Sequence, residues 1–299
     1  MIVIALLLGL AHASQSVEVV DACGNKDFVD THNPPETPKE KAEREKWMGR
    51  VVFSRVRIVG AQLPISVLTQ IREELRNHKY RGIYSRGEIQ ERALDQFQTL
   101  GYFKVRITPE FKLISGSKCF HRASVRFHVE QGIQYRLGKI DFTKSIFPPE
   151  ELRKLFPMED GKIFDTSKVR AGLENLRRKY DNNGYINFVA VPDVRIREEE
   201  KVVDLNIDLD AGTQFHVRQL GVAGLTDERF QQFYAVFPLK EGSVFDSEAF
   251  EHFFHEHPEF VPRNFTIETD TITKQDPTTS TVDLRIDLSG YHIKWPDMN

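Results

Sequence analysis

A repeat of about 80 residues is the sequence feature that most constrains how this chain can fold. Three segments of alternating apolar and polar residues each end in a glycine, at Gly132, Gly212 and Gly290. These glycines lie 80 and 78 residues apart. A second landmark, an aliphatic and an aromatic residue followed by Ser or Asp, recurs as Ile83–Ser85, Ile163–Asp165 and Val244–Asp246. The period predicts three copies of one small domain, although the length of 299 residues alone would suggest about two domains.

Each copy shows the same order of predicted elements. An opening strand precedes a short helix and a longer helix, and two alternating strands close the unit. The first of these closing strands is expected at Phe103–Ile107, Ile186–Ala190 and Phe265–Ile267 in the three copies. In the second copy, the longer helix carries an apolar stripe and stops at Gly184, a residue that suits the left-handed conformation after a helix end. We therefore expect an α+β protein of three tandem β-α-α-β-β domains, each a three-stranded mixed sheet packed on two helices. The expected domains are residues 51–132, 133–212 and 213–290, the third being divergent.

Two further patterns predict local structure. Ser85, Asp165 and Asp246 precede the longer helices and are expected to be their N-caps. Pro109 and Pro192 fall in the first strand after the longer helix. Because proline has no N–H to donate to a ladder, this strand should lie at a sheet edge.

The ends of the chain carry different patterns. Residues 1–13 form an apolar run that closes with Ala11-His12-Ala13, which predicts a signal peptide with cleavage before Ser14. Residues 14–50, rich in proline and charge, are predicted to be a disordered linker, and 291–299 a tail. Cys23 and Cys119 are the two cysteines. The sequence leaves open whether they form a disulfide or remain two free thiols.

The second copy carries a family resemblance. Gly161–Asp165, which opens its longer helix, and Tyr180–Tyr185, which closes it, are similar to polypeptide-transport-associated (POTRA) domains, and the match extends over about residues 50–290. In the third copy, Glu259-Phe260 stands in place of Gly-Tyr. The resemblance implies a periplasmic, non-enzymatic module of outer-membrane barrel assembly or two-partner secretion. Members usually continue into a membrane β-barrel, so a stand-alone protein and a fragment of a larger barrel-bearing protein are both open.

We expect the array to bind unfolded or extended outer-membrane polypeptides, or an outer-membrane β-barrel partner, by adding a strand to an exposed sheet edge. The net charge of −3 argues against a nucleic-acid partner. No cofactor is implied, and no membrane-spanning segment is expected in the mature chain. The candidate polypeptide-binding residues are Phe103, Lys104, Val105, Arg106, Ile107, Phe188, Val189, Ala190 and Val191. Of these, we expect Val189 and Val191 to face outward, and Phe188, Ala190 and the neighbouring Ile186 to face the helices.

Two other classes of function compete with this hypothesis. A structural scaffold subunit of an envelope or cell-division complex would bind one folded partner. A metalloenzyme would use the cluster of His252, His255 and His257 with Glu251 and Glu256. The sequence lacks the HExxH pattern, a Gly-x-Ser-x-Gly motif and a phosphate loop, so a solvated helix end is the preferred interpretation of the histidines and neither catalysis nor a bound metal is expected.

Overall fold

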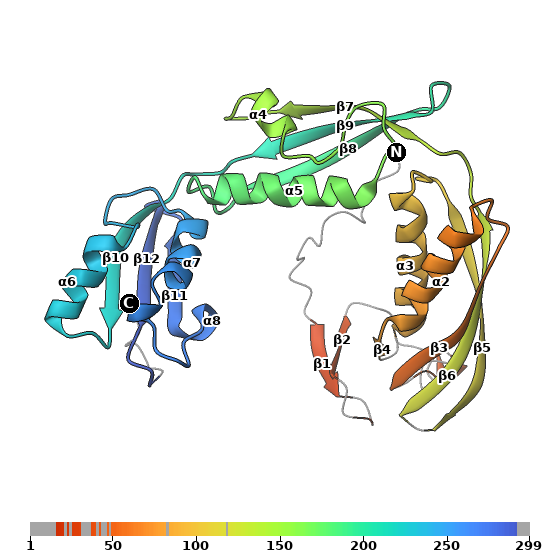
Figure 1. Ribbon diagram of the computed structural model, residues 1–299, viewed down its shortest axis with the longest axis horizontal. Helices are drawn as coiled ribbons and strands as arrows, with labels where there is room; N and C mark the ends of the chain where they lie inside the picture. The colour runs from red at the N-terminus through yellow and green to blue at the C-terminus, as the bar shows by residue number, and fades with distance from the viewer. Residues whose placement is uncertain are drawn as a thin grey trace. The chain divides into compact units, whose positions relative to one another are not determined.

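The structure is a computed structural model that describes Ser16–Val20, Cys23, Lys26–Asp30, 37–39, Ala42, Trp47, 49–81, 84–117 and 119–291 (Figure 1). The predicted signal peptide, Ile83 and residues 292–299 lie outside this set. The chain divides into two compact units, and their border passes through the middle repeat. The first unit comprises 1–139, 158–168 and 194–204, and the second comprises 140–157, 169–193 and 205–299.

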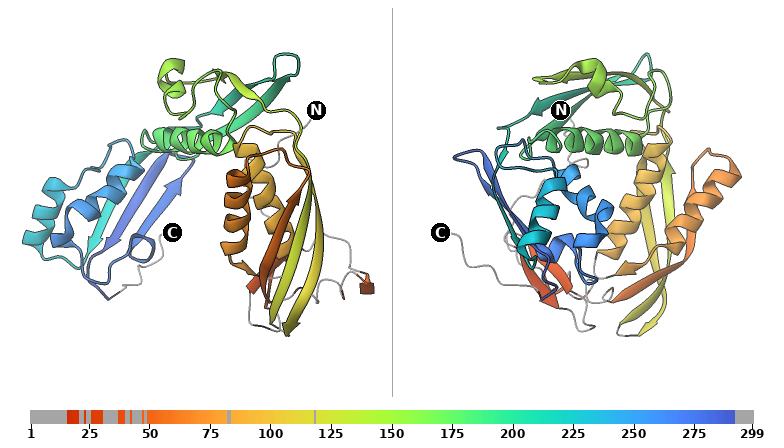
Figure 2. Two further views of the ribbon diagram at one scale, coloured as in Figure 1. Left: turned by 45° about the vertical axis from the view of Figure 1, so that its right-hand side comes forward. Right: turned by 60° about the vertical axis from the view of Figure 1, so that its left-hand side comes forward.

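The first repeat is a mixed sheet covered on one face by two helices (Figures 1 and 2). Its elements are β3 (Arg50–Val59), α2 (Ile65–Asn77), β4 (Tyr80–Arg81), α3 (Ser85–Thr99), β5 (Arg106–Ser117) and β6 (Phe120–Glu130). The strand order is β4-β3-β6-β5, with β3 parallel and β5 antiparallel to β6. The sheet thus has the predicted three strands and, in addition, the two-residue strand β4.

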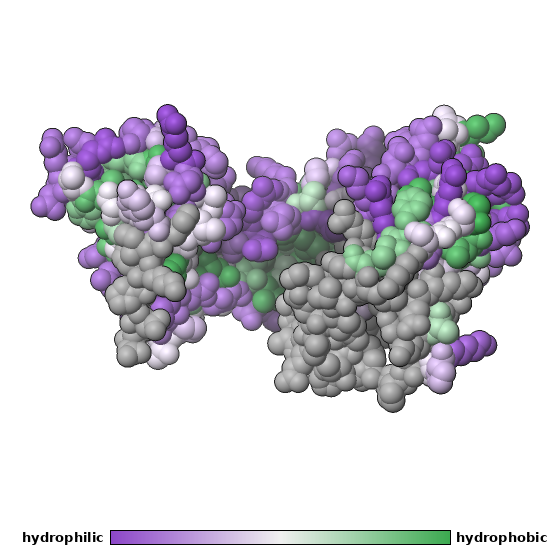
Figure 3. Space-filling view, turned by 90° about the horizontal axis from the view of Figure 1, so that it is seen from below, coloured by the Kyte–Doolittle hydropathy of each residue, from purple (hydrophilic) through white to green (hydrophobic). Residues whose placement is uncertain are grey.

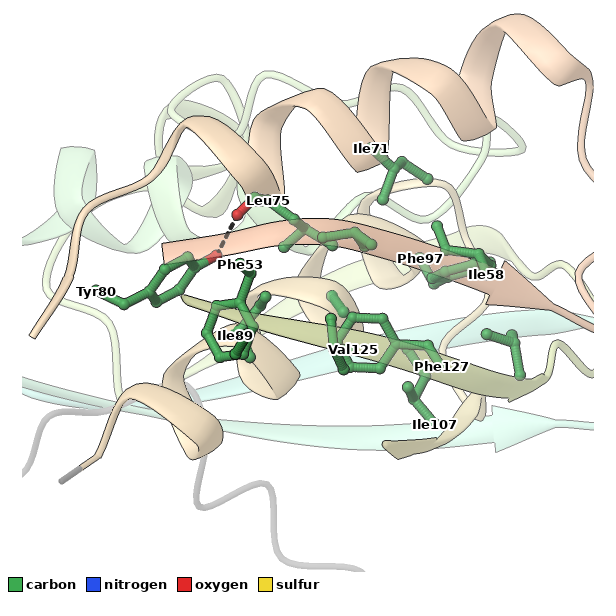
Figure 4. Close-up of a cluster of buried hydrophobic side chains, with 14 of the residues drawn as sticks. Phe53, Ile58, Ile71, Leu75, Tyr80, Ile89, Phe97, Ile107, Val125 and Phe127 are labelled. Carbon is green, nitrogen blue, oxygen red and sulfur yellow. Dashed lines mark hydrogen bonds between the residues drawn. The ribbon is translucent and has the colours of Figure 1, made fainter. Parts of the chain in front are cut away.

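The core of the first repeat lies between this sheet and its helices (Figure 4). Alternate residues of β6, among them Val125 and Phe127, are buried, as the period of two predicts. Tyr80 is also fully buried, and its hydroxyl donates to the carbonyl of Leu75 over 2.8 Å. This bond satisfies the polar end of a ring that otherwise packs edge-on against Phe53.

The middle repeat follows the same order of elements. It contains β7 (Arg136–Thr143), α4 (Pro149–Arg153), α5 (Thr166–Asp181), β8 (Val189–Arg197) and β9 (Val202–Asp210). The strand order β7-β9-β8 places the last strand in the centre and β8 at an edge. The same arrangement holds β5 at an edge in the first repeat, so both prolines lie in edge strands as predicted.

The third repeat has the order β10-β12-β11. Its elements are β10 (His216–Ala223), α6 (Asp227–Val236), α7 (Ser247–Glu256), a 3₁₀ turn (Pro258–Phe260), α8 (Ile267–Asp270), β11 (Thr271–Asp276) and β12 (Thr281–Asp287). A strand was expected at Phe265–Ile267, but Thr266 caps the short helix α8 there and the strand begins at Thr271. The expectation of strand at that position was wrong because an ST-type cap competes locally with extended backbone.

Two of the three predicted helix caps are present. Asp246 accepts a hydrogen bond from the Ala249 N–H at 2.9 Å, and Asp165 accepts one from the Ser167 N–H at 2.9 Å. Ser85 is instead the first residue of α3, and its buried hydroxyl has no hydrogen-bond partner among the described residues. Its expected role was wrong because the side chain points into the core.

The N-terminal segment differs from the predicted disordered linker. Strands β1 (Ser16–Val20) and β2 (Lys26–Asp30) form an antiparallel hairpin. Cys23, between these strands, forms a disulfide with Cys119, and their Cα atoms are 5.4 Å apart. Trp47 is only 3% exposed. A covalent bond to a residue 96 positions away gives the hairpin support that an isolated two-stranded hairpin lacks in water.

An ion pair on the sheet of the third repeat should make the stability of the fold depend on pH in the acid range. Asp283 of the central strand is 2% exposed, and its carboxylate accepts from Arg218 Nε at 2.7 Å and from a terminal guanidinium nitrogen at 2.5 Å. The hydrogen bonds from Arg218 lower the pKa of Asp283 below its usual range. A carboxyl group whose pKa is lower in the folded state stabilises the fold above the unfolded-state pKa of about 4, and this contribution is lost as the pH falls through the folded pKa.

Arg218→Met should therefore lower the urea midpoint at pH 7 and have a smaller effect at pH 2, because the contribution of Asp283 declines as the pH falls toward its lowered folded pKa. The same substitution at the exposed Arg195 of β8 is the control and should leave both midpoints nearly unchanged. An equal loss at both pH values would show that Arg218 stabilises the sheet by packing rather than by its charge.

Candidate edge-strand binding site

Strand β5 forms one edge of the sheet of the first repeat. Backbone N–H and C=O groups point to alternate sides along a strand, so Ile107, Pro109 and Phe111 share one direction. Because proline has no N–H, Pro109 costs the ladder no hydrogen bond only if its nitrogen points away from β6. The side chain of Gln90 on α3 donates to the Ile107 carbonyl at 3.2 Å. This bond agrees with an Ile107 carbonyl that points away from β6, as the Pro109 nitrogen does. The Phe111 amide and carbonyl accordingly face the open side of the sheet.

A groove runs beside this edge, between α3 and β5. It has a volume of about 650 Å³. We call it the edge groove, and its lining residues are Tyr84, Arg86, Gly87, Glu88, Gln90, Glu91 and Phe111. The ring of Phe111 supplies apolar surface, and the helix side carries the charged residues Arg86, Glu88 and Glu91. An extended chain paired with β5 would place alternate side chains into this groove.

The candidate residues of the first repeat are only partly at this edge. Arg106 and Ile107 lie in β5, where Arg106 pairs with Glu130 across the strands at 2.6 Å. Val105 is buried just before the strand. Phe103 and Lys104 lie in the preceding turn and contact the middle repeat. The Phe103 ring is edge-on to Phe164 with centroids 5.7 Å apart, and the Lys104 ammonium group pairs with Glu198.

The candidate residues of the middle repeat lie along β8. Val189 and Val191 are 44% and 51% exposed, and Ala190 is half-buried, as the alternation predicts. Phe188 precedes the strand and stacks on Tyr180 of α5, with centroids 3.8 Å apart. The two exposed valines therefore form an apolar stripe on the edge strand. Among the residues coloured in Figure 3, hydrophilic side chains cover most of the surface, with smaller apolar areas between them.

Ile186 was expected to face the helices of its own repeat, and this was wrong. It packs against the core of the third repeat instead. It occupies the same place after Gly184 that Phe103 occupies after Gly101, and both side chains reach forward into the next repeat. Apolar alternation indicates that a side chain is buried, but it does not indicate which domain buries it.

The contacts between consecutive repeats follow one scheme, which the sequence analysis missed. In the first joint, the Tyr135 N–H donates to the Gly101 carbonyl at 2.8 Å, and the Gln134 side chain donates to the Leu100 carbonyl at 2.9 Å. The second joint repeats both bonds with the same distances, from Phe215 to Gly184 and from Gln214 to Asn183. The recurrence of Gln and an aromatic residue 80 positions apart is the sequence signal for this joint.

The aromatic residue of the first joint also makes a polar contact within its own repeat that the phenylalanine of the second joint cannot make. The Tyr135 hydroxyl donates to Glu198 at 2.6 Å, and the second joint has Phe215 in the equivalent place. Burial, with the bond to Glu198, raises the pKa of Tyr135 to about 12, so its hydroxyl stays protonated and a donor at neutral pH. The hydrogen bond from Lys104 lowers the pKa of Glu198.

The histidines on and after α7 do not form a metal site in the described part of the chain. His252 pairs with Glu256 at 3.2 Å and His257 with Glu259 at 2.9 Å, both near the surface. Among the described residues, no group of three or more His, Cys, Asp or Glu side chains is arranged to hold a metal ion. Within the same residues, none of the helices combines the length and the apolar character that crossing a membrane requires.

A family model for POTRA, described as a surface antigen variable number repeat, matches residues 135–212. The middle repeat is a POTRA domain. A curated relative, the outer membrane protein assembly factor BamA of Neisseria meningitidis serogroup B, is 26% identical over 141 residues. That match covers 45% of this chain and only 17% of the relative.

A solved structure of a POTRA array shares the fold. POTRA domains 3–5 of BamA from Haemophilus influenzae match 80% of this chain and 96% of that chain, with a TM-score of 0.56 and 17% identity. BamA from Haemophilus ducreyi lacking POTRA domains 1–3 matches 53% of this chain and 29% of that chain, with a TM-score of 0.41 and 18% identity. The predicted resemblance to POTRA domains and the predicted fold of three tandem β-α-α-β-β domains are confirmed.

Proposed function

We propose that this chain is a periplasmic polypeptide-binding module in outer-membrane protein assembly or secretion, and that it captures extended chains by pairing them with β5 and β8. The single observation that carries this proposal is the position of these two strands, each outermost in its sheet and each containing a proline. An exposed edge offers backbone donors and acceptors that bind an extended chain of almost any sequence.

The two edges differ in what they offer to side chains. Beside β5, the edge groove combines the Phe111 ring with charged residues of both signs on α3. On β8, Val189 and Val191 are exposed on the face opposite to Phe188 and Ala190. A bound strand of alternating apolar and polar residues would therefore find apolar contacts on one of its faces at each edge. Strands of outer-membrane barrels have this alternation.

The disulfide supports the proposed compartment. Disulfides persist in oxidising environments, which include the bacterial periplasm, and are rare in the cytosol. Cys23–Cys119 joins the N-terminal segment to the first repeat. The proposed partners are extended outer-membrane polypeptides or an outer-membrane β-barrel protein.

The composition of a pull-down tests this function. Purified protein should retain a range of unfolded barrel precursors from solution, and a synthetic barrel-strand peptide should compete with all of them. A peptide of the same length with proline at every position is the control, since it has no N–H group on either side, cannot form the ladder and should not compete. Recovery of one stoichiometric folded partner that the peptide does not displace would contradict the proposal and favour a structural scaffold.

A further inference from the structure

The sheet of the first repeat has a second face, opposite to the one that α2 and α3 cover, and the charged side chains on it are exposed (Figures 1 and 2). Side chains alternate between the two faces along each strand, so the pairing register identifies the residues of this outer face. Its Arg, Lys, Asp and Glu side chains are Arg50, Arg55, Arg57, Arg106, Lys112, Arg122 and Arg126, with Glu110 and Glu130. The face is therefore strongly basic, although the whole chain has a net charge of −3.

The carboxylates of the outer face neutralise only part of it. Glu130 pairs with Arg106 at 2.6 Å, and Glu110 pairs with Arg126 at 3.1 Å. The other five cations extend from there toward the start of β6, and we call them the basic face: Arg50, Arg55, Arg57, Lys112 and Arg122. Within the part of the chain that the structure describes, none of these five makes an ion pair. Their charge is available to a partner.

The stability of the sheet does not explain this arrangement of charges. Arg57 lies directly opposite Arg126, and Arg55 and Lys112 flank Ser124 from its two sides. Like charges on neighbouring strands destabilise a sheet. A concentration of one sign of charge instead attracts a partner of the opposite sign.

Exposed apolar side chains lie beside the basic face. Phe120 is 44% exposed and lies opposite Arg50, and Ile114, at the bulge of β5, is 46% exposed. Guanidinium groups bind phosphate oxygens through two parallel hydrogen bonds. Basic side chains next to exposed aromatic and aliphatic ones are typical of protein surfaces that lie on anionic membranes. This combination favours a lipid surface over an acidic protein as the partner.

We propose that the basic face docks on an anionic phospholipid bilayer, where its cations contact lipid phosphates and the side chains of Phe120 and Ile114 enter the headgroup region. The inference goes beyond the proposed function, because docking uses the face of the sheet and strand addition uses its edge. Each Lys or Arg near an anionic membrane surface strengthens binding about fivefold at low salt. The attraction weakens as salt screens the charges.

Partition of the full chain onto lipid vesicles tests the proposal. Vesicles of mixed phosphatidylglycerol and phosphatidylcholine are compared with vesicles of phosphatidylcholine alone, by flotation at rising lipid concentration. The variant with Arg55→Gln, Arg57→Gln and Arg122→Gln should bind the phosphatidylglycerol vesicles about 100-fold more weakly, because it loses three charges at about fivefold each. Its partition onto phosphatidylcholine alone should be unchanged. An equal affinity of this variant and the unsubstituted protein for the phosphatidylglycerol vesicles would overturn the proposal.

The matched control removes the same charge from three exposed arginines outside the basic face, with Arg76→Gln, Arg195→Gln and Arg263→Gln. It should bind the phosphatidylglycerol vesicles like the unsubstituted protein. Both triple variants should keep the melting temperature of the unsubstituted protein, since all six side chains are exposed. Equal weakening in the two variants would show that the net charge of the chain decides binding, and it would overturn the assignment to this face.

Two further measurements identify the partner. Phe120→Ser should weaken binding to the phosphatidylglycerol vesicles about three- to tenfold, because the ring no longer enters the headgroup region. Soluble polyglutamate is the probe for an acidic protein and should not compete with the vesicles at equal carboxylate and lipid concentrations. Binding of polyglutamate without binding to either kind of vesicle would assign the basic face to an acidic protein and overturn the lipid proposal.

Discussion

Gly184→Ala is expected to lower the free energy of unfolding by about 2–4 kcal/mol, because it adds steric overlap to backbone strain. Gly184 has a φ of +81°, and a Cβ atom there would lie 2.8 Å from the Phe215 carbonyl oxygen and 2.8 Å from a methyl carbon of Val244. Both neighbours belong to the third repeat, so the overlap falls in the second joint. Urea-induced unfolding measures the loss.

Gly161→Ala is the matched control for this substitution. Gly161 has a nearly identical φ of +79°, but no atom lies within 4 Å of the added carbon. We expect it to cost only about 1 kcal/mol, the strain of a left-handed non-glycine residue. Limited proteolysis should also cut near residues 184–215 faster in Gly184→Ala than in Gly161→Ala. Equal losses of stability in the two variants would mean that the close approach of Gly184 to the third repeat adds nothing to the cost of the substitution.

Val191→Pro should lower the free energy of unfolding by about 3 kcal/mol or more. Amide directions alternate along β8, and Pro192 fits where its nitrogen faces the open edge. The amide of Val191 therefore faces the central strand β9, and proline at this position removes a ladder hydrogen bond and inserts a ring into the ladder. Thermal melting monitored by circular dichroism measures the effect.

Ala190→Pro, one residue away, is the control. The Ala190 amide shares the direction of Pro192 and faces the open edge, so its loss should shift the melting temperature little. The side chain is small and half-buried, which limits the cost of the substitution itself. Strong destabilisation by Ala190→Pro and a mild effect of Val191→Pro would reverse the assignment of the two amide directions.

The elements and edges of the sheets could be predicted from the sequence because their causes are local. Side chains alternate in a strand and recur every 3.6 residues in a helix, so the order of strands and helices follows from apolar spacing. Pro109 and Pro192 place their strands at sheet edges because a missing N–H is a property of the residue itself. The family resemblance of the middle repeat rests on equally local features, at Gly161–Asp165 and Tyr180–Tyr185.

The joints and the N-terminal segment could not be predicted in the same way. Phe103 was predicted to be part of an edge strand, and Ile186 was predicted to face the helices of its own domain. The apolar character of a residue indicates that it is buried, but not which domain buries it. The pairing of Cys23 with Cys119 joins residues 96 positions apart, and only the folded first repeat brings Cys119 to the place where Gly49 and Arg50 pass. The candidate binding stretches of the sequence therefore included several residues that the joints already occupy.

Titration of Ala190→Pro with a synthetic barrel-strand peptide tests the central claim most directly. If β8 accepts an added strand, the loss of one edge donor should raise the Kd about three- to tenfold while the melting temperature stays near that of the unsubstituted protein. Ala190→Ser keeps the amide N–H and should bind like the unsubstituted protein. A Kd for Ala190→Pro equal to that of Ala190→Ser, in proteins that are equally folded, would contradict strand addition at this edge.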